Sequence, residues 1–198
     1  MANTKWQVYT GEARFMKIYE PDFFEGVGKY KAPIVVSKET LDKMKEAGIR
    51  RQPKDDPDGK GKLVTFTRDF TKEFEKGKIT FFCPPSIYDK DGKALVEYYN
   101  RETNKRVTQF TEEEKDKIER RGKEVLIGNG SIVELRIAVY DAGKFRGSRL
   151  EAIRIIDLIE YTRPEYKSEL ADAEGTPFDV DTKVQLPEKK QEPAKIGW

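Results

Sequence analysis

The residues that most often perform chemistry in proteins are scarce in this chain. Its 198 residues include no histidine and one cysteine, Cys83. Without histidine, the chain lacks the best acid–base side chain near neutral pH, the usual zinc ligand, and every Ser–His or Cys–His nucleophile pair. One cysteine forms no internal disulfide and no thiolate cluster, which agrees with a reducing compartment. Carboxylates with Mg²⁺ could still hydrolyse bonds, but we expect a protein without a cofactor.

Three carboxylates lie on or beside predicted strands, where metal-dependent nucleases place theirs: Glu97, Asp141 and Asp157. Nothing in their spacing selects them as a pair for acid–base work. Solvated or ion-paired side chains are the simpler interpretation. We therefore expect a protein that is not an enzyme, and a magnesium-dependent nuclease or recombination enzyme stays as an alternative.

Two other motifs resemble ligand sites only superficially. Residues 50–62 form an exposed loop whose cluster at 55–59 suggests calcium binding, but Lys54 takes the first ligand position of an EF-hand loop and Thr65 that of its bidentate glutamate. The glycine-rich stretch 128–131 lacks the Lys-Ser/Thr pair of a phosphate-binding loop and does not open a helix. We expect no metal at the first motif, and at the second a tight turn with positive φ.

Basic residues recur beside aromatic residues along the chain. Non-specific binding of single-stranded nucleic acid needs this mixture, because bases offer π faces for stacking and phosphates attract cations. An aromatic-rich β domain with many basic residues also shows such neighbours by chance. The candidate phosphate-binding residues are Lys29, Lys31, Arg68, Lys72, Lys78, Arg101, Lys105, Arg106, Lys144, Arg146 and Arg149, and the candidate base-stacking residues are Tyr30, Phe81, Tyr88, Tyr98, Tyr99 and Phe145.

Charge is segregated along the chain although its total nearly cancels. Residues 1–164 hold 33 basic and 28 acidic side chains, whereas residues 165–198 hold 5 and 8. The second part has three prolines and few large apolar residues, so it buries too little surface to offset its ordering entropy. We expect a folded domain over 1–164 and a flexible acidic tail over 165–198, and simple solubilisation is the alternative role for such a tail.

Most of the domain has the apolar patterning of β-strands. The expected helices are two: one capped by Ser37 and ended by Gly48, and one that starts at Thr111 and ends at 120–122. The segment 149–161 fits helical spacing nearly as well as alternation, but its four isoleucines favour a strand. The expected strands cover 14–20, 29–36, 62–71, 79–83, 94–99, 133–139 and 149–161. This pattern predicts a mostly β barrel or sandwich with one or two short helices.

No window approaches the roughly 18 uncharged apolar residues of a membrane span, and residues 1–10 lack the apolar stretch of a secretory signal. We therefore expect an intracellular protein that does not contact membranes.

The turn at 128–131, with the strand that follows it through Tyr140 and the long apolar last strand, resembles the single-stranded DNA-binding proteins of short-tailed lytic bacteriophages. The resemblance covers about residues 12–161 and the tail. Its further pieces are the stretch 19–23 followed by 28–30 and Val35-Val36, the charged stretch 100–106, and an acidic tail closed by an aromatic residue, here Trp198.

The resemblance implies an oligonucleotide-binding (OB) fold, a five-stranded barrel whose groove takes single strands. It also implies a role in DNA replication, recombination and repair in the cytoplasm of the infected bacterial host, and a homodimer formed by tail exchange. The tail, with Asp179, Asp181 and Trp198, would compete with DNA and recruit the phage DNA polymerase and helicase-primase. Here the acidic cluster lies at 169–181 and the final stretch contains Lys189, Lys190 and Lys195, which departs from the family pattern. A virion or partner-binding β domain without a nucleic-acid role is the remaining alternative.

Overall fold

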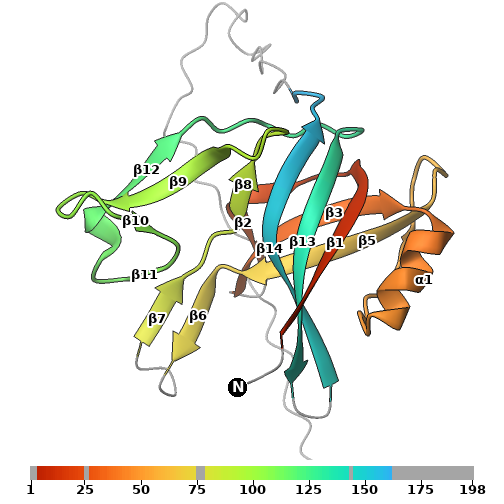
Figure 1. The fold of residues 1–198 in the computed structure, drawn as a ribbon, viewed down its shortest axis with the longest axis horizontal. Coiled ribbons are helices and arrows are strands. Elements are labelled where there is room, and N and C mark those ends of the chain that lie inside the picture. Colours follow the sequence, from red (N-terminus) through yellow and green to blue (C-terminus); the bar gives the residue numbers. More distant parts are fainter. Residues whose placement is uncertain (1–3, 25–26, 75–78, 143–144, 162–198) are drawn as a thin grey trace, which may run out of the picture. The chain divides into compact units, whose positions relative to one another are not determined.

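The described part of the chain is built almost entirely of β-strands (Figure 1). The structure is a computed structural model that describes residues 4–24, 27–74, 79–142 and 145–161. The expected tail, with Asp179, Asp181 and Trp198, lies outside these residues. The elements are β1 (Lys5–Ala13), β2 (Lys17–Phe24), β3 (Val27–Val36), α1 (Lys38–Glu46), β4 (Lys54–Asp55), β5 (Lys62–Asp69), β6 (Thr71–Phe74), β7 (Ile79–Phe82), β8 (Ser86–Tyr88), β9 (Ala94–Asn100), β10 (Arg106–Val107), β11 (Phe110–Thr111), the 3-10 turn η1 (Lys115–Lys117), β12 (Ile118–Gly122), β13 (Ile132–Ala142) and β14 (Phe145–Asp157).

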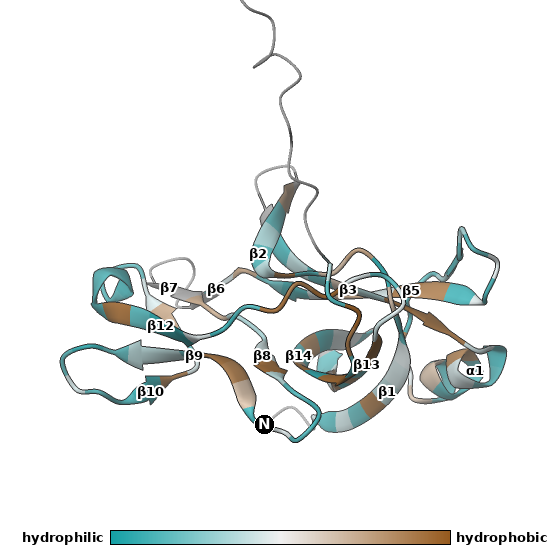
Figure 2. Cartoon of the chain, turned by 90° about the horizontal axis from the view of Figure 1, so that it is seen from above, coloured by the Kyte–Doolittle hydropathy of each residue, from teal (hydrophilic) through white to brown (hydrophobic). Residues whose placement is uncertain are grey.

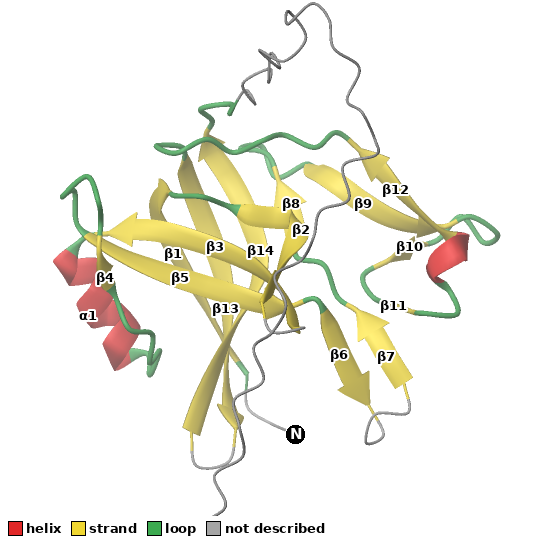
Figure 3. Cartoon of the chain, turned by 180° about the vertical axis from the view of Figure 1, so that it is seen from behind, coloured by secondary structure: helices red, strands yellow, loops and turns green. Residues whose placement is uncertain are grey.

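Five of these strands form a barrel, which Figure 3 shows from behind. Their order in the sheet is β14-β13-β1-β3-β5, and each neighbouring pair is antiparallel. The two end strands, β5 and β14, contact each other and close the ring. In chain order the ring reads first, second, third, fifth, fourth, which is the order of an OB barrel. The mostly β, OB-like fold class expected from the sequence is therefore confirmed.

Side chains hold the closing seam between β5 and β14. The Arg68 guanidinium donates from Nη1 to the Leu150 carbonyl oxygen at 3.1 Å, and Arg51 donates from Nη2 to the Ser148 carbonyl oxygen at 3.0 Å. Between the described strands β5 and β14 no backbone ladder forms. Arg68 lies on the same side of β5 as Val64 and Phe66, as the sequence predicts, and this position places the arginine at the seam.

Alternation along the strands builds the core. Val133, Leu135, Ile137 and Val139 point inward as predicted, and Figure 2 shows hydrophobic colour on β13 and β14. The segment 149–161 is a strand up to Asp157, as its isoleucines indicate. Its register shifts between the Arg136–Ala152 and Ile137–Leu150 pairs, which leaves an extra residue at a β-bulge.

Helix α1 follows the predicted boundaries. The Thr40 amide donates to Ser37 Oγ at 3.2 Å, and Gly48 adopts a φ of 85°, which glycine tolerates best. Leu41 and Met44 cover the barrel core. No helix in the described ranges has the length and apolar character that crossing a membrane requires.

The second expected helix is wrong. Thr111 does form a capped turn, since its amide donates to the Glu114 carboxylate at 2.9 Å, but only the 3-10 turn η1 follows. Residues 118–122 instead form β12, which pairs antiparallel with β9. Pairing with an available sheet edge outweighs the local helix signals, because tertiary contacts override propensity.

An insert at residues 70–131 separates the third and fourth strands of the barrel. From this insert β8 joins the barrel sheet parallel to β14, and β9 pairs with β8, β10 and β12. We call β9, β10 and β12 the arm. In Figures 1 and 3 the arm and α1 lie on opposite sides of the barrel.

A buried arginine fastens the loop at 50–62 to the barrel. Arg14 is 2% exposed, and its guanidinium contacts Glu12 at 2.5 Å, Asp56 at 3.2 Å and Asp58 at 3.1 Å. Burial of Asp56 raises its pKa, but the hydrogen bonds from Arg14 and the Lys60 amide, together with the positive charges of both residues, outweigh that effect, so the net pKa is lowered. The aspartate cluster that resembles a calcium loop therefore binds an arginine.

The glycine-rich turn at 128–131 is confirmed as a tight turn, with Gly130 at a φ of 95°. Ser131 Oγ donates to the Gly128 carbonyl oxygen at 2.8 Å and accepts from the Ile159 amide at 2.9 Å. The turn thus joins the start of β13 to the segment after β14.

Candidate nucleic-acid interface

The outward positions of β1, β13, β14 and β8 carry an unusual set of side chains. Residues that alternate with the core on these strands point away from the barrel, because successive side chains of a strand face opposite sides. Cross-strand pairing brings them together: Trp6 pairs with Ala138, and Val8 with Arg136. We call this surface the outer face, and define it by Trp6, Tyr88, Arg136, Tyr140, Arg149 and Arg154.

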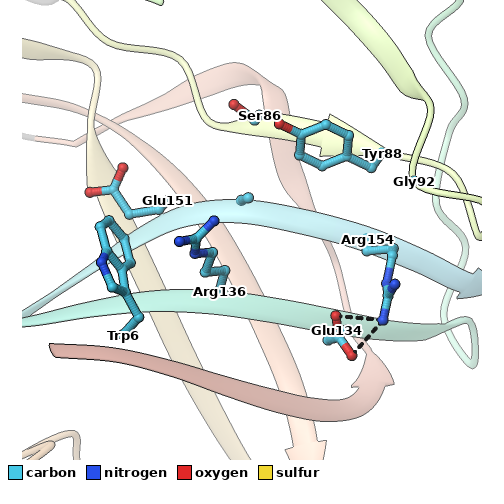
Figure 4. Close-up of a pocket in the computed structure, with 9 residues that line it drawn as sticks. Trp6, Ser86, Tyr88, Gly92, Glu134, Arg136, Glu151 and Arg154 are labelled. Carbon is cyan, nitrogen blue, oxygen red and sulfur yellow. Dashed lines mark hydrogen bonds and ion pairs between the residues drawn. The ribbon is translucent and has the colours of Figure 1, made fainter.

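A hollow of about 530 Å³ lies on the outer face (Figure 4). Trp6 stands at its edge and is 50% exposed. Arg136 Cζ lies 4.4 Å from the centroid of the Trp6 ring, a cation–π contact. Among the described residues Arg136 has no carboxylate partner, so its charge remains available to a ligand.

The other charges of the hollow are paired. Arg154 Nη2 lies 2.8 Å and 2.9 Å from the two carboxylate oxygens of Glu134, as Figure 4 shows. Its Nε atom is buried and has no hydrogen-bond partner, which is a costly state for a charged donor. Glu151 binds Arg68 at 2.6 Å and Arg149 at 2.5 Å. Glu134 and Glu151 therefore pair with arginines that could otherwise bind an anionic ligand.

A second pair of an aromatic ring and an arginine lies beside the hollow. The Tyr140 ring lies over Gly147, where a Cβ atom would come within 2.6 Å of the ring. Arg149 Cζ lies 6.0 Å from the ring centroid. Gly147 thus allows Tyr140 to lie close to β14, where its ring and Arg149 form a platform.

The arm presents a third pair. Arg121 Cζ lies 4.5 Å from the centroid of the Tyr99 ring, and Arg106 pairs with Glu97 at 3.1 Å. Arg101 and Lys105 are exposed at the turn between β9 and β10, and neither has a carboxylate partner within the part of the chain that the structure describes. The predicted residues of the stretch 99–106 therefore gather on one basic turn.

Two of the predicted stacking residues lie elsewhere, in an aromatic cluster between the barrel and the insert. Tyr30 is 3% exposed, and its ring centroid is 5.9 Å from that of Phe70. Tyr98 is 5.9 Å from Phe110, and burial raises the pKa of both tyrosines. A base could contact these rings only inside this cluster.

The remaining predicted residues are scattered. Lys29 and Lys31 lie on β3, where Lys31 pairs with Asp22 at 2.5 Å, and Lys72 is exposed on β6. Arg146 lies 3.7 Å from Asp141, near the start of β14. Lys78 and Lys144 lie outside the described residues, as do the side chains of Phe81 and Phe145.

The structure does not gather the candidate catalytic carboxylates. Glu97 binds Arg106 and accepts a hydrogen bond from the Tyr99 hydroxyl at 3.1 Å, Asp141 lies near Arg146, and Asp157 is exposed at the end of β14. No group of three or more metal-ligating side chains occurs among the described residues. Burial raises the pKa of the Cys83 thiol, which disfavours the reactive thiolate.

Four residues of the outer face are missed when only adjacent basic and aromatic residues are considered: Trp6, Arg136, Tyr140 and Arg154. The alternation that predicts the strand 133–139 places Arg136 on the side opposite the core. Trp6 joins it through the pairing of β1 with β13, which joins residues far apart in the chain. Outward positions of predicted strands thus reveal Arg136, whereas Trp6 lies on β1, a strand that the expected strands do not include.

No protein-family model and no curated protein sequence matches the chain. Among solved structures it is similar to gp2.5, a single-stranded DNA-binding protein encoded by bacteriophage T7, with a TM-score of 0.50, 16% identity, and coverage of 82% of this chain and 92% of that chain. The single-stranded DNA-binding protein from bacteriophage Enc34 aligns with a TM-score of 0.41, 13% identity, and coverage of 84% and 89%. The chain therefore shares its fold with a phage single-stranded DNA-binding protein, as the sequence resemblance implies.

Proposed function

We propose that the protein binds single-stranded DNA without sequence preference and catalyses no reaction. The observation that carries this proposal is the half-exposed Trp6 ring with Arg136 stacked on it beside an open hollow on an OB barrel. An exposed indole is a stacking platform for a base, and a guanidinium without a carboxylate partner attracts the adjacent phosphate. Stacking tolerates every base, so such a site reads no sequence.

The arrangement of the pairs suggests a path for the strand. Tyr140 with Arg149 lies beside the hollow, and Tyr88 lines it. Each aromatic residue can hold one base while the arginines follow the backbone. This path runs over β1, β13 and β14, whereas many OB domains bind oligonucleotides over the second and third strands, here β3 and β5.

The wider role and the tail belong to the same proposal. We propose that the protein acts in phage DNA replication, recombination and repair in the cytoplasm of the infected host. Residues 1–164 would bind DNA, and the tail at 165–198, with its excess of acidic residues, would compete with DNA or recruit the DNA polymerase and helicase-primase. Asp179, Asp181 and Trp198 would contact these partners, and exchange of tails would form a homodimer.

Oligo-dT should bind tightly at low salt and duplex DNA of equal length weakly. Contacts with three to six phosphates would make the plot of log K against log salt fall with a slope of roughly −2 to −4, because single strands release about 0.7 ions per phosphate contact. Fluorescence anisotropy of labelled oligo-dT measures both quantities. A chain stopped after Pro164 should bind more tightly if the tail opposes DNA.

Two outcomes would contradict the proposed function. The absence of binding to oligo-dT at micromolar protein and low salt, or an affinity insensitive to salt, would favour a partner-binding β domain. Cleavage of labelled single or double strands in Mg²⁺ or Mn²⁺ would favour a nuclease, and loss of that cleavage in E97Q, D141N or D157N would identify its carboxylates.

Replacing Glu134 with glutamine should strengthen binding of oligo-dT. The Glu134 carboxylate occupies Arg154, and a phosphate must displace it to reach the guanidinium. Half-exposed pairs of this kind contribute about 0.2–1 kcal/mol, so we expect affinity to rise by up to about fivefold at low salt and less at high salt. The same anisotropy titration measures the change.

E39Q provides the matched control for E134Q. Glu39 pairs with Lys43 on α1, away from the outer face, so its neutralisation removes one negative charge without freeing an outer-face arginine. Equal gains in oligo-dT affinity in E134Q and E39Q would show that the effect comes from net charge alone. A loss of affinity in E134Q would instead mean that Glu134 holds Arg154 in its binding position.

A further inference from the structure

A second cavity lies between the barrel and the insert, apart from the hollow of the outer face. It has a volume of about 260 Å³. We call it the aromatic pocket, and define its walls by Tyr30, Phe70, Phe82, Tyr98 and Phe110. Tyr30 comes from barrel strand β3, Phe70 is the first residue of the insert, and the other three come from strands of the insert.

The rings of the pocket form one continuous chain of contacts. Phe70 meets Phe82 edge to face with centroids 5.0 Å apart, and Phe82 stacks on Phe110 at 5.4 Å. Protein interiors are packed so closely that voids larger than a water molecule are few. A cavity of this volume between such rings is therefore a place where a further flat group can enter.

The rim of the pocket is cationic. Lys115 Nζ lies 5.1 Å from the centroid of the Phe82 ring, and Arg120 donates a hydrogen bond to the Tyr98 hydroxyl. Both side chains also pair with glutamates, Lys115 with Glu112 and Arg120 with Glu124, and both are about half exposed. Flat rings inside and movable cations outside fit a planar group that is joined to an anion.

The arm connects this pocket to the basic turn. Tyr98 and Tyr99 are consecutive in β9, so their side chains face opposite sides of the arm. Tyr98 with Arg120 faces the pocket, and Tyr99 with Arg121 faces the other side. A strand that follows the arm could thus place one base on Tyr99 and turn a neighbouring base toward Tyr98.

We propose that the aromatic pocket takes one base of the bound single strand, turned out of the base stack, while Lys115 and Arg120 hold its phosphate. This inference rests on the proposed function and adds a separate site to it. A base of a single strand is already unpaired, so the cost of turning it out is small compared with that in a duplex. Aromatic walls would hold it between flat faces as they hold flipped bases in enzymes.

Filling the pocket tests the proposal. Ile118 lines it and is half-buried, so I118W would place an indole in the space that the base needs. We expect I118W to lower the affinity for oligo-dT by about 5- to 150-fold, the effect of one stacked base. I159W is the matched control, because Ile159 is 52% exposed and lines neither the hollow nor the pocket, and it should bind like the unaltered chain.

Photo-crosslinking of the unaltered chain supplies a second measurement that does not depend on a variant. Oligo-dT that carries single 5-iododeoxyuridine residues should crosslink to Tyr98 or Phe110 as well as to Trp6. Crosslinks confined to the outer face, together with full affinity in I118W, would overturn the pocket proposal and leave the proposed function intact. No binding by the unaltered chain would contradict the proposed function itself.

A protein ligand is the competing occupant, and the same variant separates the two. An acidic peptide with a terminal aromatic residue could place its ring in the pocket and its carboxylate on Lys115 and Arg120. If I118W abolishes binding of such a peptide but not of oligo-dT, the pocket serves a protein partner and the base site is wrong.

Discussion

Replacing Trp6 with alanine is expected to weaken oligo-dT binding by about 5- to 150-fold, because each stacked base contributes roughly 1–3 kcal/mol. Trp6 is the most exposed aromatic ring beside the hollow, and its loss also frees Arg136 from the ring that holds it. Anisotropy titrations of W6A beside the unaltered chain measure the change. The slope against salt should stay nearly constant, since Trp6 contacts no phosphate.

W6F is the control that separates stacking from folding. It keeps a ring for the base and a π face for Arg136, so it should recover most of the lost affinity. In a W198F background, quenching of the single remaining tryptophan by oligo-dT would report contact at Trp6 directly. If W6A kept full affinity for oligo-dT at an unchanged melting temperature, DNA would have to bind at a surface other than the outer face.

Replacing Arg14 with methionine should cause the largest loss of stability. The change leaves the Asp56 carboxylate buried without its partner, and removal of one partner of a buried ion pair costs about 3–5 kcal/mol. Denaturant unfolding measures the free energy. R154M is the matched control, because Arg154 is half exposed and its pair with Glu134 should contribute less than about 1 kcal/mol.

The pH dependence of unfolding checks the same cluster. The Arg14 and Lys60 hydrogen bonds lower the pKa of Glu12, and the pKa of Asp56 is also lowered. Lowered carboxylate pKa values contribute stability that is present above the unfolded value of about 4 and disappears as pH falls through the folded value. The deficit of R14M should therefore shrink below about pH 4, and a deficit that stays constant with pH would argue against the ion pair as its cause.

Local patterns predict those parts of the fold that depend on local physics. Alternation predicts the core side of the strand 133–139, and an N-cap and a glycine predict the two ends of α1. The expected helix after Thr111 fails because β9 offers an edge to residues 118–122. That edge comes from another part of the chain, so a local window contains no information about it.

The binding surface is harder to predict for a geometric reason. Tyr30 stands between Lys29 and Lys31 in sequence, but in a strand the ring and the two ammonium groups face opposite sides. The structure accordingly buries Tyr30 and leaves Lys31 half-exposed. The pair of Trp6 and Arg136 forms across strands instead. Adjacency in sequence therefore overestimates some sites and misses others.

The pairing of β1 with β13 also governs when the outer face can exist. Lys5 pairs with Val139, so the first strand of the barrel waits for nearly the whole domain to be made. At 5–20 residues per second this delay is on the order of ten seconds on the ribosome. Long-range pairings of this kind make folding slow. Trp6 and Arg136 meet only when β1 pairs with β13, and the hollow also needs Glu151 and Arg154 of β14, so a chain that ends before β14 carries no complete hollow.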